Sequence, residues 1–78
     1  MMEDEELKGI DKKELIGVVK KTDSTSVVIR INEFQGESGV DIREYVNTNK
    51  YKGLTKKGTR IPKSKWKEFK EVIMHIDF

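Results

Sequence analysis

The chain has 78 residues, of which 35% are hydrophobic and 38% are charged, with a formal net charge of +2. A chain this short forms one small domain with a modest core, and such domains usually need a disulfide, a metal or a partner subunit for stability. The sequence has no cysteine, which excludes a disulfide framework and thiolate metal sites, and it has one histidine, His75. We therefore expect self-association, and neither a metal nor another cofactor.

No apolar segment approaches the roughly 20 residues that a membrane helix needs, so no membrane partner is expected. Residues 3–6 are all acidic, where a secretory signal would be basic. We read residues 1–13 as a flexible acidic arm and residues 14–78 as the domain. A cytoplasmic location is expected, at the nucleoid in a prokaryote and in the nucleus in a eukaryote.

Four strands are predicted, at residues 15–20, 26–34, 40–46 and around 57–61. Residues 26–34 alternate with period 2, which is typical of a strand with one face on a core. Two glycines within residues 35–39 predict the turn of an antiparallel hairpin, and residues 47–53 are predicted as a polar loop. Pro62 ends the fourth strand and suits the first turn of a helix, where its missing N–H is not needed.

A helix is predicted from residue 62 to residue 76, because Trp66, Phe69, Ile73 and Ile76 recur at three- and four-residue steps. The fold class is therefore α+β: a four-stranded antiparallel sheet followed by one amphipathic helix, which is available to cover the sheet or a partner. Core packing is the favoured role of Trp66 and Phe69.

Catalysis is not indicated. Gly53 to Gly58 imitates the opening of a phosphate-binding loop, but a strand follows in place of the required helix. Asp41 and Glu44 fall on opposite faces of a strand and cannot form an acid/base pair. His75 lies near the predicted helix end, where a structural or surface role is favoured. The sequence therefore predicts a protein that is not an enzyme.

Basic residues concentrate between positions 50 and 70, where nine lysines and arginines stand against a single acid, Glu68. Such a local excess attracts polyanions even in a nearly neutral molecule, although a charge run is often only a solvated face. Phe34 shares a strand face with Arg30 and Asn32, and an aromatic ring beside cations is what base stacking requires. Its pattern fits a ligand contact and a core position equally well.

Several segments together resemble the positive-cofactor-four family of transcriptional coactivators: residues 33–36, 40–45, 55–58 and 62–66. The resemblance covers roughly residues 25–76 and implies a curved sheet, a helix-mediated homodimer and binding of single-stranded DNA with little sequence preference. It also implies binding of melted duplex. The serine-rich tail of the animal members is absent here, which suggests a minimal, prokaryotic-type member.

By position, Phe34 resembles the stacking phenylalanine of the family, and Arg43, Lys56 and Lys57 resemble its phosphate contacts. Val46 stands where the family often has an aromatic residue, so binding is expected to rely more on Tyr45 and on lysines before the fourth strand. The expected nucleic-acid contacts are Phe34, Arg43, Lys56, Lys57, Gly58, Arg30, Tyr45, Lys50 and Lys52, with Tyr51 as a further candidate. The expected dimer interface comprises Trp66, Phe69, Val72, Ile73 and Ile76.

The sequence thus predicts a homodimeric single-stranded DNA-binding protein that acts in transcription regulation or in replication and repair. Two alternatives stay open. The basic surface could dock acidic partners of the transcription machinery, or the ligand could be single-stranded RNA, since stacking and phosphate contacts tolerate either nucleic acid.

Overall fold

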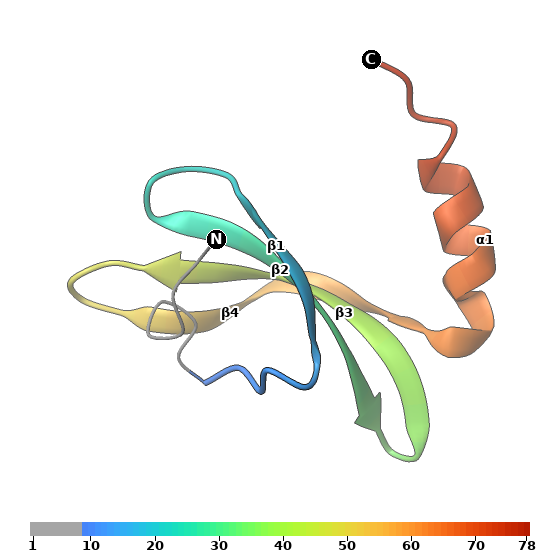
Figure 1. Ribbon diagram of the computed structural model, residues 1–78, viewed down its shortest axis with the longest axis horizontal. Coiled ribbons are helices and arrows are strands. Elements are labelled where there is room, and N and C mark those ends of the chain that lie inside the picture. Colours follow the sequence, from blue (N-terminus) through green and yellow to red (C-terminus); the bar gives the residue numbers. More distant parts are fainter. Residues whose placement is uncertain (1–8) are drawn as a thin grey trace.

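The computed structural model describes residues 9–78 (Figure 1). The elements are β1 (Leu15–Lys20), β2 (Thr25–Phe34), β3 (Glu37–Asn47), β4 (Lys52–Pro62) and α1 (Lys63–Ile73). Each strand pairs antiparallel with the next, in the order β1-β2-β3-β4. The predicted four-stranded antiparallel sheet followed by one C-terminal helix is therefore confirmed, and the sheet is open. The acidic residues 3–6 and most of the predicted arm lie outside the described residues.

The element boundaries differ from the prediction at β3, β4 and α1. The turn between β2 and β3 takes only Gln35 and Gly36, which have φ angles of 53° and 82°. This is the backbone that a tight two-residue hairpin turn requires, so the ladder extends to the pair Phe34 and Glu37. β4 begins at Lys52 because it pairs along nearly all of β3, whereas its polar composition predicts a loop there.

The helix ends three residues earlier than its apolar periodicity predicts. After Ile73 the backbone tightens, and the amides of His75 and Ile76 donate to the carbonyl oxygens of Val72 and Ile73, three residues back. Such tight turns are common at helix C-termini. The apolar positions continue past the helix, but the α-helical hydrogen bonds do not.

The sheet has two chemically different faces, because cross-strand partners lie on the same side of a sheet. We call one the arginine face; it carries Arg30, Asn32 and Phe34 of β2, Asp41, Arg43 and Tyr45 of β3, and Arg60 of β4. We call the other the aliphatic face; it carries Val27, Ile29 and Ile31 of β2, Val40 and Ile42 of β3, and Ile61 of β4.

The core of the chain is small and lies at the middle of the sheet. Among the described residues, Val28, Val40 and Tyr45 are the buried hydrophobic side chains. α1 contributes no buried residue and projects from the end of β4 away from the sheet (Figure 1). The apolar side of the helix therefore has little to pack against within its own chain.

Gly58 lets β4 lie close to β3. A Cβ at this position would lie 2.7 Å from Arg43 Cα and closer still to the carbonyl oxygen of Ile42, both of them backbone atoms. We expect Gly58→Ala to lower the free energy of unfolding by about 1–3 kcal/mol, because the strands must separate to admit the methyl group. Urea unfolding measures the change. Gly17→Ala is the control, since its Cβ would meet nothing within 4 Å, and an equal effect of both substitutions would contradict the argument.

Candidate nucleic-acid interface

A buried carboxylate organises the middle of the arginine face. Asp41 accepts hydrogen bonds from Arg30 Nε at 2.9 Å and from Arg43 Nη2 at 3.0 Å. Arg43 also donates through Nη1 to the carbonyl oxygen of Thr55 on β4, at 3.1 Å. These bonds tie β2, β3 and β4 together. They also fix the guanidinium of Arg43 while leaving some of its five N–H groups without a partner in the sheet.

Two opposing effects set the pKa of Asp41. Burial by itself raises the pKa of this carboxyl group, because it disfavours the charged form. Hydrogen bonds from Arg43 and Arg30, together with their charges, outweigh burial and hold the pKa below its ordinary value. Asp41 is therefore ionised at neutral pH, and its negative charge offsets part of the positive charge of the two arginines.

Phe34 stands at the end of the arginine face with its ring in solvent. Phe34 is 61% exposed, and the guanidinium carbon of Arg60 lies 5.9 Å from the centroid of its ring. Arg60 is held by three hydrogen bonds, from Nε to the Asn32 side-chain oxygen and from Nη2 to the carbonyl oxygens of Asn32 and Glu37. The structure thus presents a flat apolar ring beside a fixed cation.

Gly39 makes room for this arrangement. A Cβ at Gly39 would lie 2.6 Å from the guanidinium carbon of Arg60, so the missing side chain lets that group lie across β3. Sequence reasoning counts Arg60 among the basic residues but does not assign it to the site. Its position opposite Asp41 in the ladder is the signal that could have found it, and that signal requires the register of β4.

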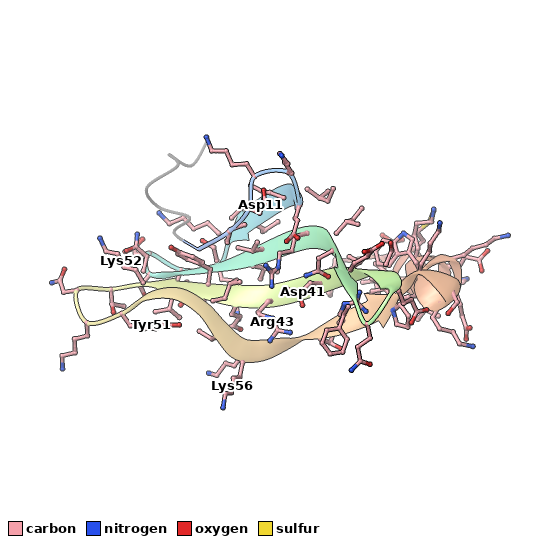
Figure 2. The ribbon with its side chains drawn as sticks, turned by 90° about the horizontal axis from the view of Figure 1, so that it is seen from below. Asp11, Asp41, Arg43, Tyr51, Lys52 and Lys56 are labelled. Carbon is pink, nitrogen blue, oxygen red and sulfur yellow. The ribbon has the colours of Figure 1, made fainter. Side chains whose placement is uncertain are left out.

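Lys56 and Lys57, adjacent in sequence, lie on different sides of the sheet. Lys56 is exposed and points away from β4 on the same side as Arg43 (Figure 2). Lys57 lines a surface hollow of about 240 Å³ with Val27 and Ile42 of the aliphatic face. The structure therefore brings Lys56, but not Lys57, to the side of the sheet that carries Phe34 and Arg43.

Glu44 lies beside Lys57 in this hollow. It accepts a hydrogen bond of 2.8 Å from Lys21 Nζ in the turn after β1. This bond is the main cause that lowers the pKa of Glu44. Burial opposes it, and the charges of Lys21 and Lys57 add to the lowering. The carboxylate reduces the positive potential near Lys57.

The two tyrosines differ in access to solvent. Tyr45 is only 1% exposed, so its ring belongs to the core of the chain and does not reach a ligand in this arrangement. Tyr51 is exposed, and its hydroxyl donates to the carbonyl oxygen of Leu54 at 2.6 Å, which fixes the ring over the loop. Lys50 and Lys52 are exposed on either side of Tyr51.

The residues expected at the dimer interface lie on α1 and just beyond it. Trp66 and Phe69 are half-buried and stack on each other, with ring centroids 5.6 Å apart. Val72, Ile73 and Ile76 are exposed, Ile73 at 42%. Met74, which sequence reasoning does not select, is also exposed.

An open antiparallel sheet with cations around an exposed ring, followed by an unpacked helix, is the geometry expected of a binding protein of the nucleic-acid class. The family model described as Transcriptional Coactivator p15 (PC4) matches residues 21–72, two thirds of the chain. The chain belongs to this family, the positive-cofactor-four family of nucleic-acid-binding coactivators, which carries a single-stranded DNA-binding domain. No curated protein and no solved structure matches the chain significantly.

Within residues 9–78, no helix is long and apolar enough to cross a membrane. The same residues contain no cluster of three or more histidine, cysteine, aspartate or glutamate side chains placed to hold a metal ion.

Proposed function

We propose that the chain binds single-stranded DNA through its arginine face, as a homodimer, in transcription regulation or in replication and repair. The observation that carries the proposal is the exposed ring of Phe34 beside the fixed guanidinium of Arg60. An unstacked base can lie on the ring while the guanidinium meets a phosphate. Family membership supports the same ligand and supports a site of action at the nucleoid or in the nucleus.

Cations along this face are proposed to follow the backbone of the strand. Phe34 and Arg43 are separated by six residues in the ladder, because Arg43 pairs with Val28. The face is thus about 20 Å long between them, at about 3.3 Å per residue. Arg43 lies near the middle and Lys56 lies on β4, so phosphates along an extended strand meet successive cations, and Lys50 and Lys52 extend the positive surface.

The proposed dimer rests on the unpacked helix. The apolar residues of α1 fall on one side, yet none of them is buried within the chain. A second copy that packs its helix against the first would cover Ile73 and its neighbours, and would add the core that one small protomer lacks. A dimer also presents two arginine faces, which lengthens the strand that one molecule holds.

Replacing Phe34 with alanine is expected to weaken binding to a single strand of DNA about 5- to 150-fold, because one stacked base contributes about 1–3 kcal/mol. The salt dependence should not change, since the phosphate contacts remain. For about four neutralised phosphates, the slope of log affinity against log salt is near −3 in both proteins. Fluorescence anisotropy at several salt concentrations measures both quantities.

Phe78→Ala is the matched control, because it removes another exposed phenylalanine at the C-terminus. It should bind as the wild type does. The alternative of an acidic protein partner predicts the opposite pattern, in which the single strand binds weakly and Phe34→Ala changes nothing. A matching RNA strand in the same assay decides between RNA and DNA, since a clear preference for RNA would overturn the DNA assignment.

A further inference from the structure

A carboxylate lies beside the stacking ring at the end of the arginine face. Glu37 begins β3 and pairs with Phe34 across the two-residue turn. Because cross-strand partners point to the same side of a sheet, the side chain of Glu37 lies next to the ring of Phe34, and both residues are exposed. We call Phe34, Glu37 and Arg60 the hairpin corner. A ligand on the ring thus meets both a carboxylate and a guanidinium group.

The hairpin corner is open to a ligand. β1 pairs with β2 only as far as Arg30, and β4 pairs with β3 only as far as Gly39. The tip of the β2–β3 hairpin therefore projects beyond its neighbouring strands (Figure 1). A base can approach the ring of Phe34 with its hydrogen-bonding edge toward Glu37 and Arg60.

The carboxylate of Glu37 is free to accept hydrogen bonds. Within residues 9–78 it forms no ion pair and no hydrogen bond. Only the backbone carbonyl oxygen of Glu37 is engaged, and it accepts a bond of 2.8 Å from Arg60 Nη2. A carboxylate has two acceptor oxygens side by side and no donor. It therefore suits a ligand that presents two neighbouring N–H groups.

Arg60 keeps two of its five N–H groups for a ligand. Its Nε donates to the side-chain oxygen of Asn32, and its Nη2 donates to the carbonyl oxygens of Asn32 and Glu37. The two N–H groups of Nη1 have no acceptor within the described part of the chain. One of them can bind a base while the other meets a phosphate. The hairpin corner thus offers a donor and a pair of acceptors around one ring.

Guanine is the base that matches this set of groups. Its Watson–Crick edge carries the acceptor O6 followed by two neighbouring donors, N1–H and the 2-amino group. Thymine has one N–H between two carbonyl acceptors, which a carboxylate repels, and cytosine and adenine each have one amino group beside an acceptor nitrogen. In a single strand this edge is unpaired and can be read by side chains.

We propose that the hairpin corner selects guanine. The base stacks on Phe34, the carboxylate of Glu37 accepts hydrogen bonds from N1–H and the 2-amino group, and Nη1 of Arg60 donates to O6. This inference rests on the proposed function and specifies the base that the site prefers. Glu37 is then the specificity-determining residue, because at other bases its charge repels phosphates without a hydrogen bond in return.

The test measures the affinity of the full chain for four labelled strands of about 12 nucleotides by fluorescence anisotropy. The strands are a thymine homopolymer and alternating thymine–guanine, thymine–cytosine and thymine–inosine sequences. Inosine is guanine without the 2-amino group, so it stacks in the same way and isolates that one contact. Lithium buffer keeps the guanine strand from associating with itself.

We expect the thymine–guanine strand to bind about tenfold more tightly than the thymine and thymine–cytosine strands. The thymine–inosine strand should fall between them, because it retains N1–H and loses the second donor. Equal affinity for all four strands would overturn the inference. So would an inosine strand that binds as tightly as the guanine strand, since the carboxylate would then not contact the 2-amino group.

Glu37→Gln tests the residue itself. The amide has one acceptor oxygen, and its nitrogen is a donor that opposes the N–H groups of guanine. The difference between the guanine and inosine strands should fall to less than about twofold. Affinity for the thymine homopolymer should stay equal or rise, because a negative charge near the phosphates is removed. A variant that retains the guanine preference would overturn the inference.

Glu33→Gln is the matched control. Glu33 is exposed and adjoins Phe34 in sequence, but it pairs with Ser38 and points to the opposite side of the sheet. The substitution removes the same charge and should leave the guanine preference intact. If both variants lose the preference equally, net charge causes it, and the assignment to Glu37 is wrong.

The same strands separate this inference from the proposed function. If the wild type binds none of the four strands, the proposed function fails and the base preference fails with it. If the wild type binds all four strands with equal affinity, single-stranded DNA binding stands and only the selection of guanine is refuted.

Discussion

Replacing Ile73 with glutamate is expected to convert the proposed dimer into monomers. Ile73 lies on the apolar side of α1 and is 42% exposed in the protomer. Full burial of an isoleucine contributes about 1.5–3 kcal/mol, of which roughly two fifths is still to be gained at this exposure, and a symmetric dimer loses this twice. The dimer dissociation constant should therefore rise about 10- to 70-fold, before the cost of placing a carboxylate in the interface is added.

Sedimentation velocity over a range of protein concentrations measures the change. Ser64→Glu is the control, because it adds the same charge to an exposed position in the first turn of α1. A glutamate in the first turn interacts favourably with the helix dipole and should leave the dimer intact. If Ile73→Glu remains dimeric at the concentrations at which the wild type does, the interface lies elsewhere, and the exposed Ile31 and Val19 of the sheet become the next positions to test.

Replacing Asp41 with asparagine is expected to lower the free energy of unfolding at pH 7 by about 3 kcal/mol. The side chain of Asp41 is 3% exposed, and those of Arg30 and Arg43 are 18% and 24% exposed. Removal of this carboxylate leaves Arg43 without an anion and leaves Arg30 with only the more distant Glu14, whose carboxylate lies 3.7 Å away. An amide nitrogen then faces N–H donors. Urea unfolding at a fixed protein concentration measures the loss, because a dimer's stability depends on concentration.

The same substitution should remove a pH dependence. The pKa of Asp41 is lowered in the folded state, so the unfolded chain binds this proton at a higher pH than the folded chain does. The stabilisation is therefore fully present above the ordinary pKa of 3.8 and is lost as the pH falls through the lowered folded pKa. The difference between wild type and variant should shrink in strong acid.

Glu44→Gln is the matched control for Asp41→Asn. The Glu44 carboxylate also has a lowered pKa, but its partner Lys21 is half exposed and water screens the pair. We expect a much smaller change in stability from this substitution. If Glu44→Gln lowers the free energy of unfolding as much as Asp41→Asn does, the loss comes from removing any carboxylate from this basic protein. It would then not be specific to the buried ion pairs of Asp41.

Much of the fold follows from local sequence patterns. The alternation at residues 26–34 and the glycine turn predict the β2–β3 hairpin, and the apolar steps after Pro62 predict the helix. Each of the two periodic patterns reports the period of its own element. The start of β4 is the exception, because its polar residues predict a loop. Hydrogen bonds to β3, and not side-chain preference, extend the strand to Lys52.

The candidate nucleic-acid interface also combines features that the sequence predicts with features that only the structure shows. The exposure of Phe34 is a property that the sequence leaves undecided, since its pattern fits a core position as well as a ligand contact. The structure places its ring in solvent and adds Arg60, whose contact with the ring depends on the register of β4 and on the empty space at Gly39. Tyr45, an expected contact, lies in the core.

By itself, the sequence determined the class of fold, the family and the concentration of positive charge between residues 50 and 70, because these depend on residue types and their spacing. Only the tertiary structure decided which cations lie close to one another and on which face of the sheet. It places Arg30 and Arg43 around Asp41, Arg60 beside Phe34, and Lys57 on the opposite side from Lys56. The physical reason is strand register, since a shift of one residue between β3 and β4 would move every side chain of β4 to the other face.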